Sequence, residues 1–434
     1  MKRIVLLVVL LAGFLALAIA QDSSSTTMTT ATTMEVTANV TPMIETRAVW
    51  IDKSDIYKGK EAMLAMFGQL SAANFNSVYL PTMYRGYVNY PGSKYLPADP
   101  QAQKIDKDYL YWLVKEARNH GFLVGAWPEY GLYAYFTKDA KTDKSRGALL
   151  TKYPDLTSID VEGNTYLHNK DLGDFYSVCP ANPKTHDIMI KIYSEMVQKY
   201  AFDELNLDRI RFPTKDFCFC TFCQHQFKKD TGYDLTPEIV SNPVEYKAWI
   251  EWRKLQVVHF MQKLSQHMQK IRPDLILTAA VWPPTEIDEK GQDWPVWLKE
   301  GYLDIGVPML YEKTISKSVS RSIQVAPSSR QIYPGVSADD KTKSNELLVQ
   351  QIQEARDLHC GGVVIWNATK VMERLDYLKS TIFKEPAKPY VPNRPVFRST
   401  TSTREFDNLG PAKNPVVEPQ PKKSRAKKTS QSKR

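Results

Sequence analysis

The sequence predicts a single (β/α)8-barrel (TIM-barrel) domain in the α/β class, and three observations support this prediction. A strand-then-helix unit recurs eight times between residues 44 and 386, the pattern of a parallel sheet with crossover helices. Eight units in about 340 residues fit one barrel with insertions better than two domains. The alternative is an open doubly wound sheet, which normally carries a phosphate-binding loop, and neither GxGxxG nor GxxxxGK[ST] occurs in the chain.

Eight short apolar runs are the candidate strands of this barrel. They lie in residues 45–52, 74–84, 121–131, 202–213, 275–283, 303–312, 330–338 and 361–368. Most are followed by helix-length segments with apolar residues three and four positions apart. These segments lie in residues 61–74, 108–121, 186–200, 245–271, 345–358 and 370–383. Glycines are expected to end several helices in the left-handed conformation, at Gly121 and at Gly361 and Gly362.

The N-terminal segment has the composition of an export signal. Residues 1–20 begin Met-Lys-Arg and continue as an apolar run that closes on small residues, so cleavage is expected after Ala20. The run is slightly long for a signal and slightly short for a span, so an uncleaved membrane anchor is the alternative. Residues 21–43 are Ser/Thr-rich, which is linker composition. We therefore expect a secreted, periplasmic or cell-wall-associated protein.

Residues 387–434 form a Pro-, Ser- and Lys/Arg-rich tail that is predicted to be disordered. From Pro411 onward it holds eight Lys/Arg and one Glu, so this stretch carries +7 of the formal +9 net charge. The basic charge thus belongs to a tail and does not indicate nucleic-acid binding. We expect either electrostatic association with anionic wall polymers or a membrane surface, or a solubilising tail without a specific partner.

The active site of a TIM barrel lies at the carboxyl ends of its strands, where this chain has carboxylates, arginines and aromatics but no histidine. Hydrolysis of a glycosidic bond needs two carboxyl groups and no metal or cofactor. Flat aromatic faces stack on sugar rings, so the partner expected is a glycan. The candidate catalytic residues are Asp208 and Glu129, with Glu312 in reserve. The candidate substrate-binding residues are Tyr84, Trp127, Asn206, Arg211, Trp282, Tyr311 and Trp366.

Asp208 is the leading candidate. Side chains alternate along a strand, so Asn206 and Asp208 face one side and the neighbouring leucines face the other. A carboxylate at a strand centre is costly unless paired, so the alternative is a buried Asp–Arg ion pair that only stabilises the barrel. For Glu129 the alternative is a loop carboxylate accepting backbone hydrogen bonds, and for Glu312 it is a solvated loop residue.

Two arginines follow Asp208 on the opposite parity, Arg209 and Arg211. Strand ends twist, and the break at Phe212-Pro213 allows Arg211 to turn over the mouth of the barrel. We expect Arg211 to contact the substrate.

From residue 45 to about residue 383 the chain resembles the glycosyl hydrolase-like 10 family of bacterial barrels, which includes peptidoglycan glycan hydrolases. The resemblance is carried by RAVW from Arg47, AWPEYG around Glu129, residues 182–213 with LNLDRIRFP, and EGYLDIGVPMLY from residue 300. It implies a barrel that attacks N-acetylhexosamine glycans, with Asp208 at the acidic position of the family's LDxIRxP motif. The family usually has a glutamine where this chain has Met309.

The five cysteines are Cys179, Cys218, Cys220, Cys223 and Cys360. Three cluster with His225 in KDFCFCTFCQHQF, a spacing that matches no standard zinc pattern. In an exported chain a disulfide between Cys179 and one of these three is the simpler use, because both loops lie at the top of the barrel. Loop packing and zinc binding are the alternatives, and the family resemblance implies bracing of the loop. Cys360 is expected to be a buried free thiol.

The function predicted is hydrolysis of O-glycosyl bonds in an N-acetylhexosamine-containing glycan, with peptidoglycan strands as the expected substrate. A non-catalytic glycan-binding barrel would keep the aromatic residues and lose the chemistry. A polysaccharide deacetylase ranks last, because the strand ends supply no His/Asp cluster for its metal. The loop from Leu132 to Pro180 is too long for a simple connection and is expected to wall one side of a cleft.

Overall fold

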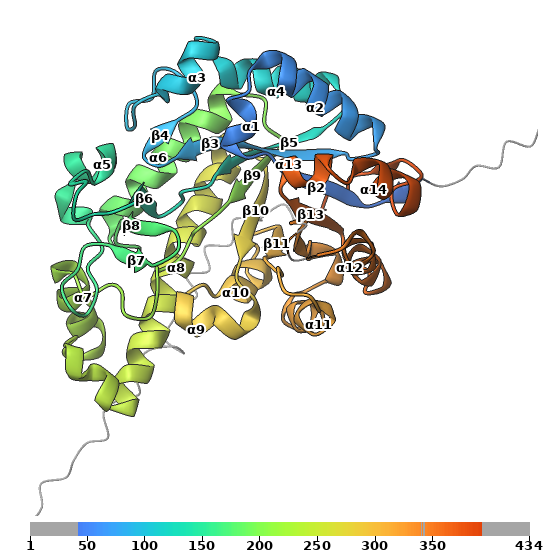
Figure 1. Ribbon diagram of the computed structural model, residues 1–434. Coiled ribbons are helices and arrows are strands. Elements are labelled where there is room, and N and C mark those ends of the chain that lie inside the picture. Colours follow the sequence, from blue (N-terminus) through green and yellow to red (C-terminus); the bar gives the residue numbers. More distant parts are fainter. Residues whose placement is uncertain (1–41, 340, 342, 393–434) are drawn as a thin grey trace, which may run out of the picture. The chain divides into compact units, whose positions relative to one another are not determined.

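A computed structural model describes residues 42–339, 341 and 343–392. Eight parallel strands form the barrel in the order β11-β10-β9-β5-β3-β2-β13-β12 (Figure 1). Their bounds are β2 Thr46–Trp50, β3 Ser77–Tyr84, β5 Leu123–Pro128, β9 Glu204–Leu207, β10 Ile276–Val281, β11 Ile305–Pro308, β12 Gly335–Ser337 and β13 Gly362–Trp366. Isolated parallel bridges from Gly306 to Ile332 and from Met309 to Gly335 join the two end strands. All eight candidate strands are confirmed, each inside its predicted segment.

Helices cover the outside of the barrel, and the predicted ones are found. They are α2 Lys60–Ala72, α4 Tyr109–Asn119, α6 Pro183–Lys199, α8 Pro243–Ile271, α12 Asn345–Asp357, α13 Ala368–Met372 and α14 Leu375–Thr381. The segment predicted as one helix at 370–383 is therefore divided into two. The side chains of Asn182 and Asn242 accept hydrogen bonds from the first turns of α6 and α8, each with proline at the start, a common N-terminal signal.

Shorter helices occupy the loops between these elements. They are α1 Lys53–Ile56, α3 Pro100–Ile105, α5 Gly147–Lys152, α7 Thr221–Thr231, α9 Ile287–Lys290, α10 Trp294–Lys299 and α11 Ser316–Val325. No helix in the described part of the chain is both long and apolar enough to cross a membrane.

The glycines expected to end helices act in two different ways. Gly121 follows α4 with φ +83°, as predicted. After α12, however, the left-handed residue is His359, with φ 56°, and the prediction for Gly361 and Gly362 is wrong. These two glycines are needed for close approach, because a Cβ would lie 2.1 Å from the Arg330 carbonyl oxygen at the first and 2.3 Å from that of Thr46 at the second.

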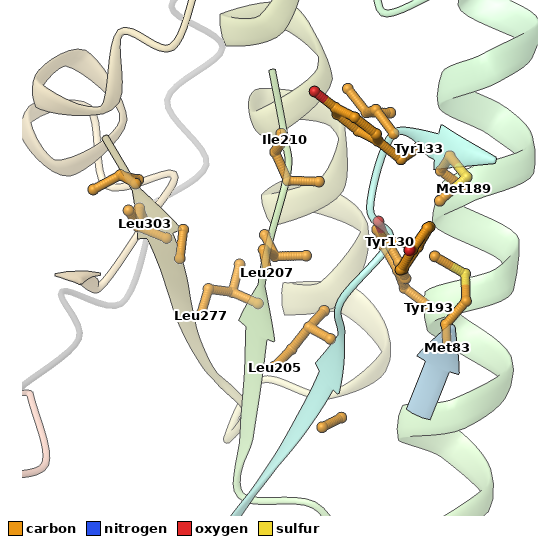
Figure 2. Close-up of a cluster of buried hydrophobic side chains, with 14 of the residues drawn as sticks. Met83, Tyr130, Tyr133, Met189, Tyr193, Leu205, Leu207, Ile210, Leu277 and Leu303 are labelled. Atoms are coloured by element: carbon orange, nitrogen blue, oxygen red, sulfur yellow. The ribbon is translucent and has the colours of Figure 1, made fainter. Parts of the chain in front are cut away.

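The strands separate two apolar layers, which confirms the alternation predicted for β9. Leu205 and Leu207 lie in the outer layer between strands and helices, together with Tyr130, Tyr193 and Leu277 (Figure 2). The inner layer fills the barrel, and its buried members are Ala48, Trp50, Tyr79, Trp127, Ile276, Ala280, Ile305, Val307, Tyr333 and Val364. The barrel interior is therefore a packed core that ends in aromatic side chains at the site.

The long loop after β5 is folded. It contains an antiparallel sheet in the order β6-β8-β7, made of Tyr133–Thr137, Gly173–Ser177 and Leu167–Asn169. This insertion sheet lies beside the segment that follows β9, and an antiparallel bridge joins Asp160 to Phe217 (Figure 1). The long loop predicted at residues 132–180 thus folds into a small sheet subdomain at the carboxyl ends of the barrel strands.

Near the two ends of the described residues, β1 (Met43–Ile44) pairs in parallel with β14 (Ala387–Lys388). This pairing reaches two residues beyond residue 386, where the barrel domain is predicted to end. The predicted signal sequence, most of the linker and most of the tail fall in residues 1–41 and 393–434, outside the described residues.

Candidate active site

Asp208 follows the last residue of β9 and faces the barrel mouth. Its side chain is buried, and Trp127 Nε1 donates a hydrogen bond to Oδ2 at 3.3 Å, while the Arg209 backbone N–H donates to Oδ1 at 2.6 Å. Burial raises the pKa of Asp208, and the positive charges of Arg209 and Arg211 oppose this shift. Among the described residues Asp208 forms no ion pair, so the alternative of an Asp–Arg scaffold pair is not what the structure contains at this position.

Glu129 follows β5 and lies in the same mouth. The residue is 8% exposed; Oε1 accepts a hydrogen bond from the Arg209 guanidinium at 3.3 Å, and Oε2 has no partner among the described residues. Burial raises the pKa of Glu129 to about 7, although Arg209 opposes the rise; Asp208 and Asp52 add to it. Glu129 is thus a carboxyl group that holds its proton for a large part of the time near neutral pH.

Arg209 connects the two carboxyl groups, and reasoning from strand parity missed it. Its backbone lies in the left-handed region, with φ 53°, and its guanidinium carbon lies 4.7 Å from the Tyr130 ring centroid and 5.5 Å from that of Tyr133. Because β9 ends at Leu207, the alternation of a strand no longer applies two residues later. The positive φ turns the side chain toward Glu129. The signal in the sequence that could have indicated Arg209 is its place directly after Asp208, the acidic residue at the strand end.

Gly131 brings the ends of β5 and β9 into direct contact. A Cβ at this position would lie 1.8 Å from the Asp208 carbonyl oxygen, and the φ of Gly131 is +24°. No side chain fits there. This close approach holds the segment with Glu129 against the segment with Asp208.

Tryptophans form the floor of the site. The ring centroids of Trp127 and Trp366 lie 5.6 Å apart, and Trp50 lies 6.2 Å from Trp366. Trp50 Nε1 donates to Asn206 Oδ1 at 2.9 Å, and Asn206 Nδ2 donates to Thr278 Oγ1 at 2.7 Å. Asn206 is completely buried. Asn206 therefore supports the tryptophan floor from below. It does not line the mouth, where it was predicted to bind substrate.

The other predicted binding residues surround the two carboxyl groups. Tyr84 packs on Tyr130 with centroids 4.9 Å apart, and Lys53 Nζ lies 3.7 Å from the Tyr84 centroid. Arg211 Nη1 donates to the Tyr133 hydroxyl at 3.1 Å, and the Arg211 guanidinium carbon lies 5.6 Å from the Trp282 centroid.

Tyr311 comes three residues after the end of β11 and is 39% exposed as a residue. Burial and the nearby Asp208 carboxylate both raise the pKa of Tyr311.

Glu312 is not brought into this cluster. It is exposed and accepts a hydrogen bond from Ser318 at 2.7 Å, on the side of α11. The physical reason is that β11 ends at Pro308, four residues earlier, so the chain has already left the barrel end.

A depression of about 530 Å³ between α2, α12 and α14 contains none of the predicted site residues.

The cysteines of the two top loops meet, as predicted, but no disulfide joins them. All five cysteines are free and buried. The Sγ atoms of Cys179, Cys218, Cys220 and Cys223 all lie within 4.8 Å of one another. Cys179 takes the fourth place that the sequence offered to His225, which is exposed on α7. The free, buried state of Cys360 is as predicted.

Comparison with solved structures finds the same fold in carbohydrate-active proteins. The PgaB (BpsB) glycoside hydrolase domain from Bordetella bronchiseptica matches with a TM-score of 0.60 at 14% identity, over 79% of this chain and 99% of that one. The catalytic domain of a beta-amylase from Paenibacillus polymyxa matches with a TM-score of 0.55 at 11% identity, over 79% and 99% of the two chains.

An alpha-L-fucosidase from Paenibacillus thiaminolyticus matches with a TM-score of 0.53 at 15% identity, over 78% of this chain and 49% of that one. At these identities the likeness establishes the barrel fold.

No curated protein sequence matches the chain significantly. The sequence pattern that defines the glycosyl hydrolase-like 10 family matches residues 45–338. The chain therefore belongs to the glycosyl hydrolase-like 10 family.

Proposed function

We propose that this protein hydrolyses glycosidic bonds in an N-acetylhexosamine-containing glycan, with peptidoglycan strands as the substrate and with Glu129 and Asp208 as the catalytic pair. The observation that carries the proposal is the pairing of two buried carboxyl groups in unequal surroundings at the carboxyl ends of β5 and β9. Two carboxyl groups whose environments separate their pKa values are what acid and base roles require.

The surroundings assign the roles. Glu129 has a pKa of about 7 and an oxygen, Oε2, without a hydrogen-bond partner in the described structure, so it is suited to carry and deliver a proton. Asp208 accepts two N–H donors, which favour its charged form against burial. In the proposed reaction Glu129 protonates the leaving glycosidic oxygen as the bond to the anomeric carbon breaks. Asp208 stabilises the positive charge at that carbon, either as a nucleophile or as the base that takes a proton from water.

The aromatic and cationic groups around the pair are suited to a sugar chain. Trp366 offers a partly exposed apolar face beside the carboxyl groups, and Tyr84, Trp282 and Tyr311 line the rim. Trp127, which was predicted to bind substrate, is 1% exposed and supports Trp366 from below. The insertion sheet extends the site on the side of Tyr133. These features favour a chain of several sugar units over a single small sugar.

The substrate class rests on family membership and on the expected export of the chain. The solved glycoside hydrolase domain from Bordetella bronchiseptica, which has the same fold, supports the reaction class. The proposal thus places a glycan hydrolase outside the cytoplasmic membrane.

The test measures reducing ends released from peptide-free glycan strands. Wild-type protein should release them, and Asp208→Asn should lower the rate at least about a hundredfold. Glu129→Gln should lower it by about 10²–10⁴-fold on the natural glycan. On aryl glycosides with a dinitrophenyl leaving group Glu129→Gln should retain most of its activity, because that leaving group needs no proton.

Glu312→Gln is the matched control, because it neutralises an exposed carboxylate that lies four residues beyond β11 and outside the site. It should keep wild-type activity. Binding of glycan strands by wild-type protein without any release of reducing ends would replace the proposal with a glycan-binding barrel. An Asp208→Asn variant as active as wild type would reject the assigned residues.

A further inference from the structure

We propose that Cys179, Cys218, Cys220 and Cys223 bind one zinc ion, in a structural site separate from the glycosidic chemistry. The inference rests on the convergence of four sulfurs from two segments that are about 40 residues apart in the sequence. It does not depend on the proposed activity.

The geometry of the sulfurs suits a tetrahedral metal. All four lie within 4.8 Å of one another, and the separations from Cys179 Sγ to Cys223 Sγ and to Cys220 Sγ are 3.4 and 3.6 Å. A zinc ion with Zn–S distances of about 2.3 Å places its ligands about 3.8 Å apart. A disulfide joins sulfurs in pairs at about 2.05 Å and gives no reason for four of them to converge on one point.

The cluster is closed to solvent. The four cysteines are 0–4% exposed, and they would occupy all four positions of a tetrahedral ion. A site without an open position for water is a structural one. Four cysteine thiolates are one of the common ligand sets of structural zinc sites.

Two features would stabilise the negative charge of such a site. Cys220 is the N-cap of α7, a helix of 11 residues, and Cys223 lies in its first turn, so both sulfurs are near the positive end of the helix. Arg253 is a completely buried cation close to Cys223, and it donates hydrogen bonds to the backbone carbonyls of Thr214, Asp288 and Glu289. Within the described ranges it forms no ion pair. A zinc ion with four thiolates carries a net charge of −2, which Arg253 would partly balance.

The metal would fasten the insertion sheet to the segment after β9. Cys179 follows β8 of that sheet, whereas Cys218 comes ten residues after Asp208. The same two segments are already joined by backbone hydrogen bonds from Phe219 to Ile159 at 2.7 Å and from Val161 to Asp216 at 3.0 Å. Zinc would therefore fix the segment that carries Arg211, and its role is one of positioning.

The experiment determines the metal content of the full-length protein, purified without added metal, by elemental mass spectrometry. We expect about one zinc per chain, and a cobalt-substituted sample should show the visible absorption and sulfur-to-cobalt charge transfer of a tetrahedral thiolate site. Cys223→Ser should lose the zinc, whereas Cys360→Ser, a buried thiol outside the cluster, should retain it. Removal of zinc by a chelator should lower the thermal midpoint of the wild-type protein.

The wild-type measurements keep the inference testable even if Cys223→Ser does not fold. Less than about 0.1 zinc per chain, with five reactive thiols after denaturation, would replace the proposal with simple packing of thiols. Two disulfides, which neither reduction nor added zinc converts to a metal site, would replace it with covalent cross-links. Both results leave the glycosidase proposal untouched, since they concern metal content and not activity.

Discussion

The contact at Gly131 gives a sharp prediction for Gly131→Ala. The new Cβ would lie 1.8 Å from the Asp208 carbonyl oxygen, and real Cβ atoms stay at least 3.0 Å from such an atom. The obstacle is backbone, so the ends of β5 and β9 must separate by at least about 1 Å. A displacement of about 1 Å between catalytic groups costs about a hundredfold in rate. We therefore expect kcat/KM on glycan strands to fall about a hundredfold, together with a loss of stability.

Gly121→Ala is the matched control. Gly121 also has a positive φ, +83°, but a Cβ there would meet nothing within 4 Å. This variant should lose about 1 kcal/mol of stability from backbone strain and keep its kcat/KM. The assays are reducing-end release and the thermal midpoint of each variant. If Gly131→Ala has the activity of wild type, or loses no more stability than Gly121→Ala, the close contact does not hold the ends of β5 and β9 in place.

Three further predictions concern protons, hydrogen bonds and charge. Because burial raises the pKa of Glu129 to about 7, kcat/KM on glycan strands should fall as pH rises through 7, whereas kcat/KM on dinitrophenyl glycosides, whose leaving group needs no proton, should not. The folded pKa exceeds the unfolded one, so the stability of wild type relative to Glu129→Gln should decline between about pH 4.5 and 7 and then level off, as measured by denaturant unfolding. Trp127→Phe removes an N–H donor to Asp208, so the acidic limb of the pH profile should move to higher pH and kcat should fall about tenfold; an unmoved limb would contradict this. Deletion of residues 393–434 should weaken sedimentation with isolated cell walls at low salt, and equal binding by both chains at every salt concentration would count against an electrostatic tail.

The barrel was predictable because its signals are long and periodic. Each strand is an apolar run closed by polar or breaker residues, and helices such as α6 show apolar residues at spacings of three and four. The position of Asp208 followed from the same alternation, since Leu205 and Leu207 must face the helices. A period of two assigns faces correctly wherever the residue lies in or directly next to a strand.

The same reasoning fails where the strand has ended. Arg209 lies two residues beyond β9 with a positive φ, and Glu312 lies four residues beyond β11, so parity describes neither side chain. Turn conformation decides both, and it depends on contacts from other segments. The sequence likewise left the use of the cysteines open among a disulfide, loop packing and zinc, because spacing along the chain does not show that all four sulfurs converge on one point.

Arg209 explains why the two carboxyl groups can differ while lying in one mouth. It pairs with Glu129 through its guanidinium and with Asp208 through its backbone N–H, so both carboxyl groups depend on the same residue. Burial acts on both groups, but Asp208 receives an additional donor from Trp127, whereas Glu129 keeps Oε2 without a partner in the described structure. The difference in donors therefore favours the charged form at Asp208 and the protonated form at Glu129. Arg209, the indole of Trp127 and the absence of a hydrogen-bond partner for Glu129 Oε2 in the described structure together allow one protonated and one charged carboxyl group at neutral pH.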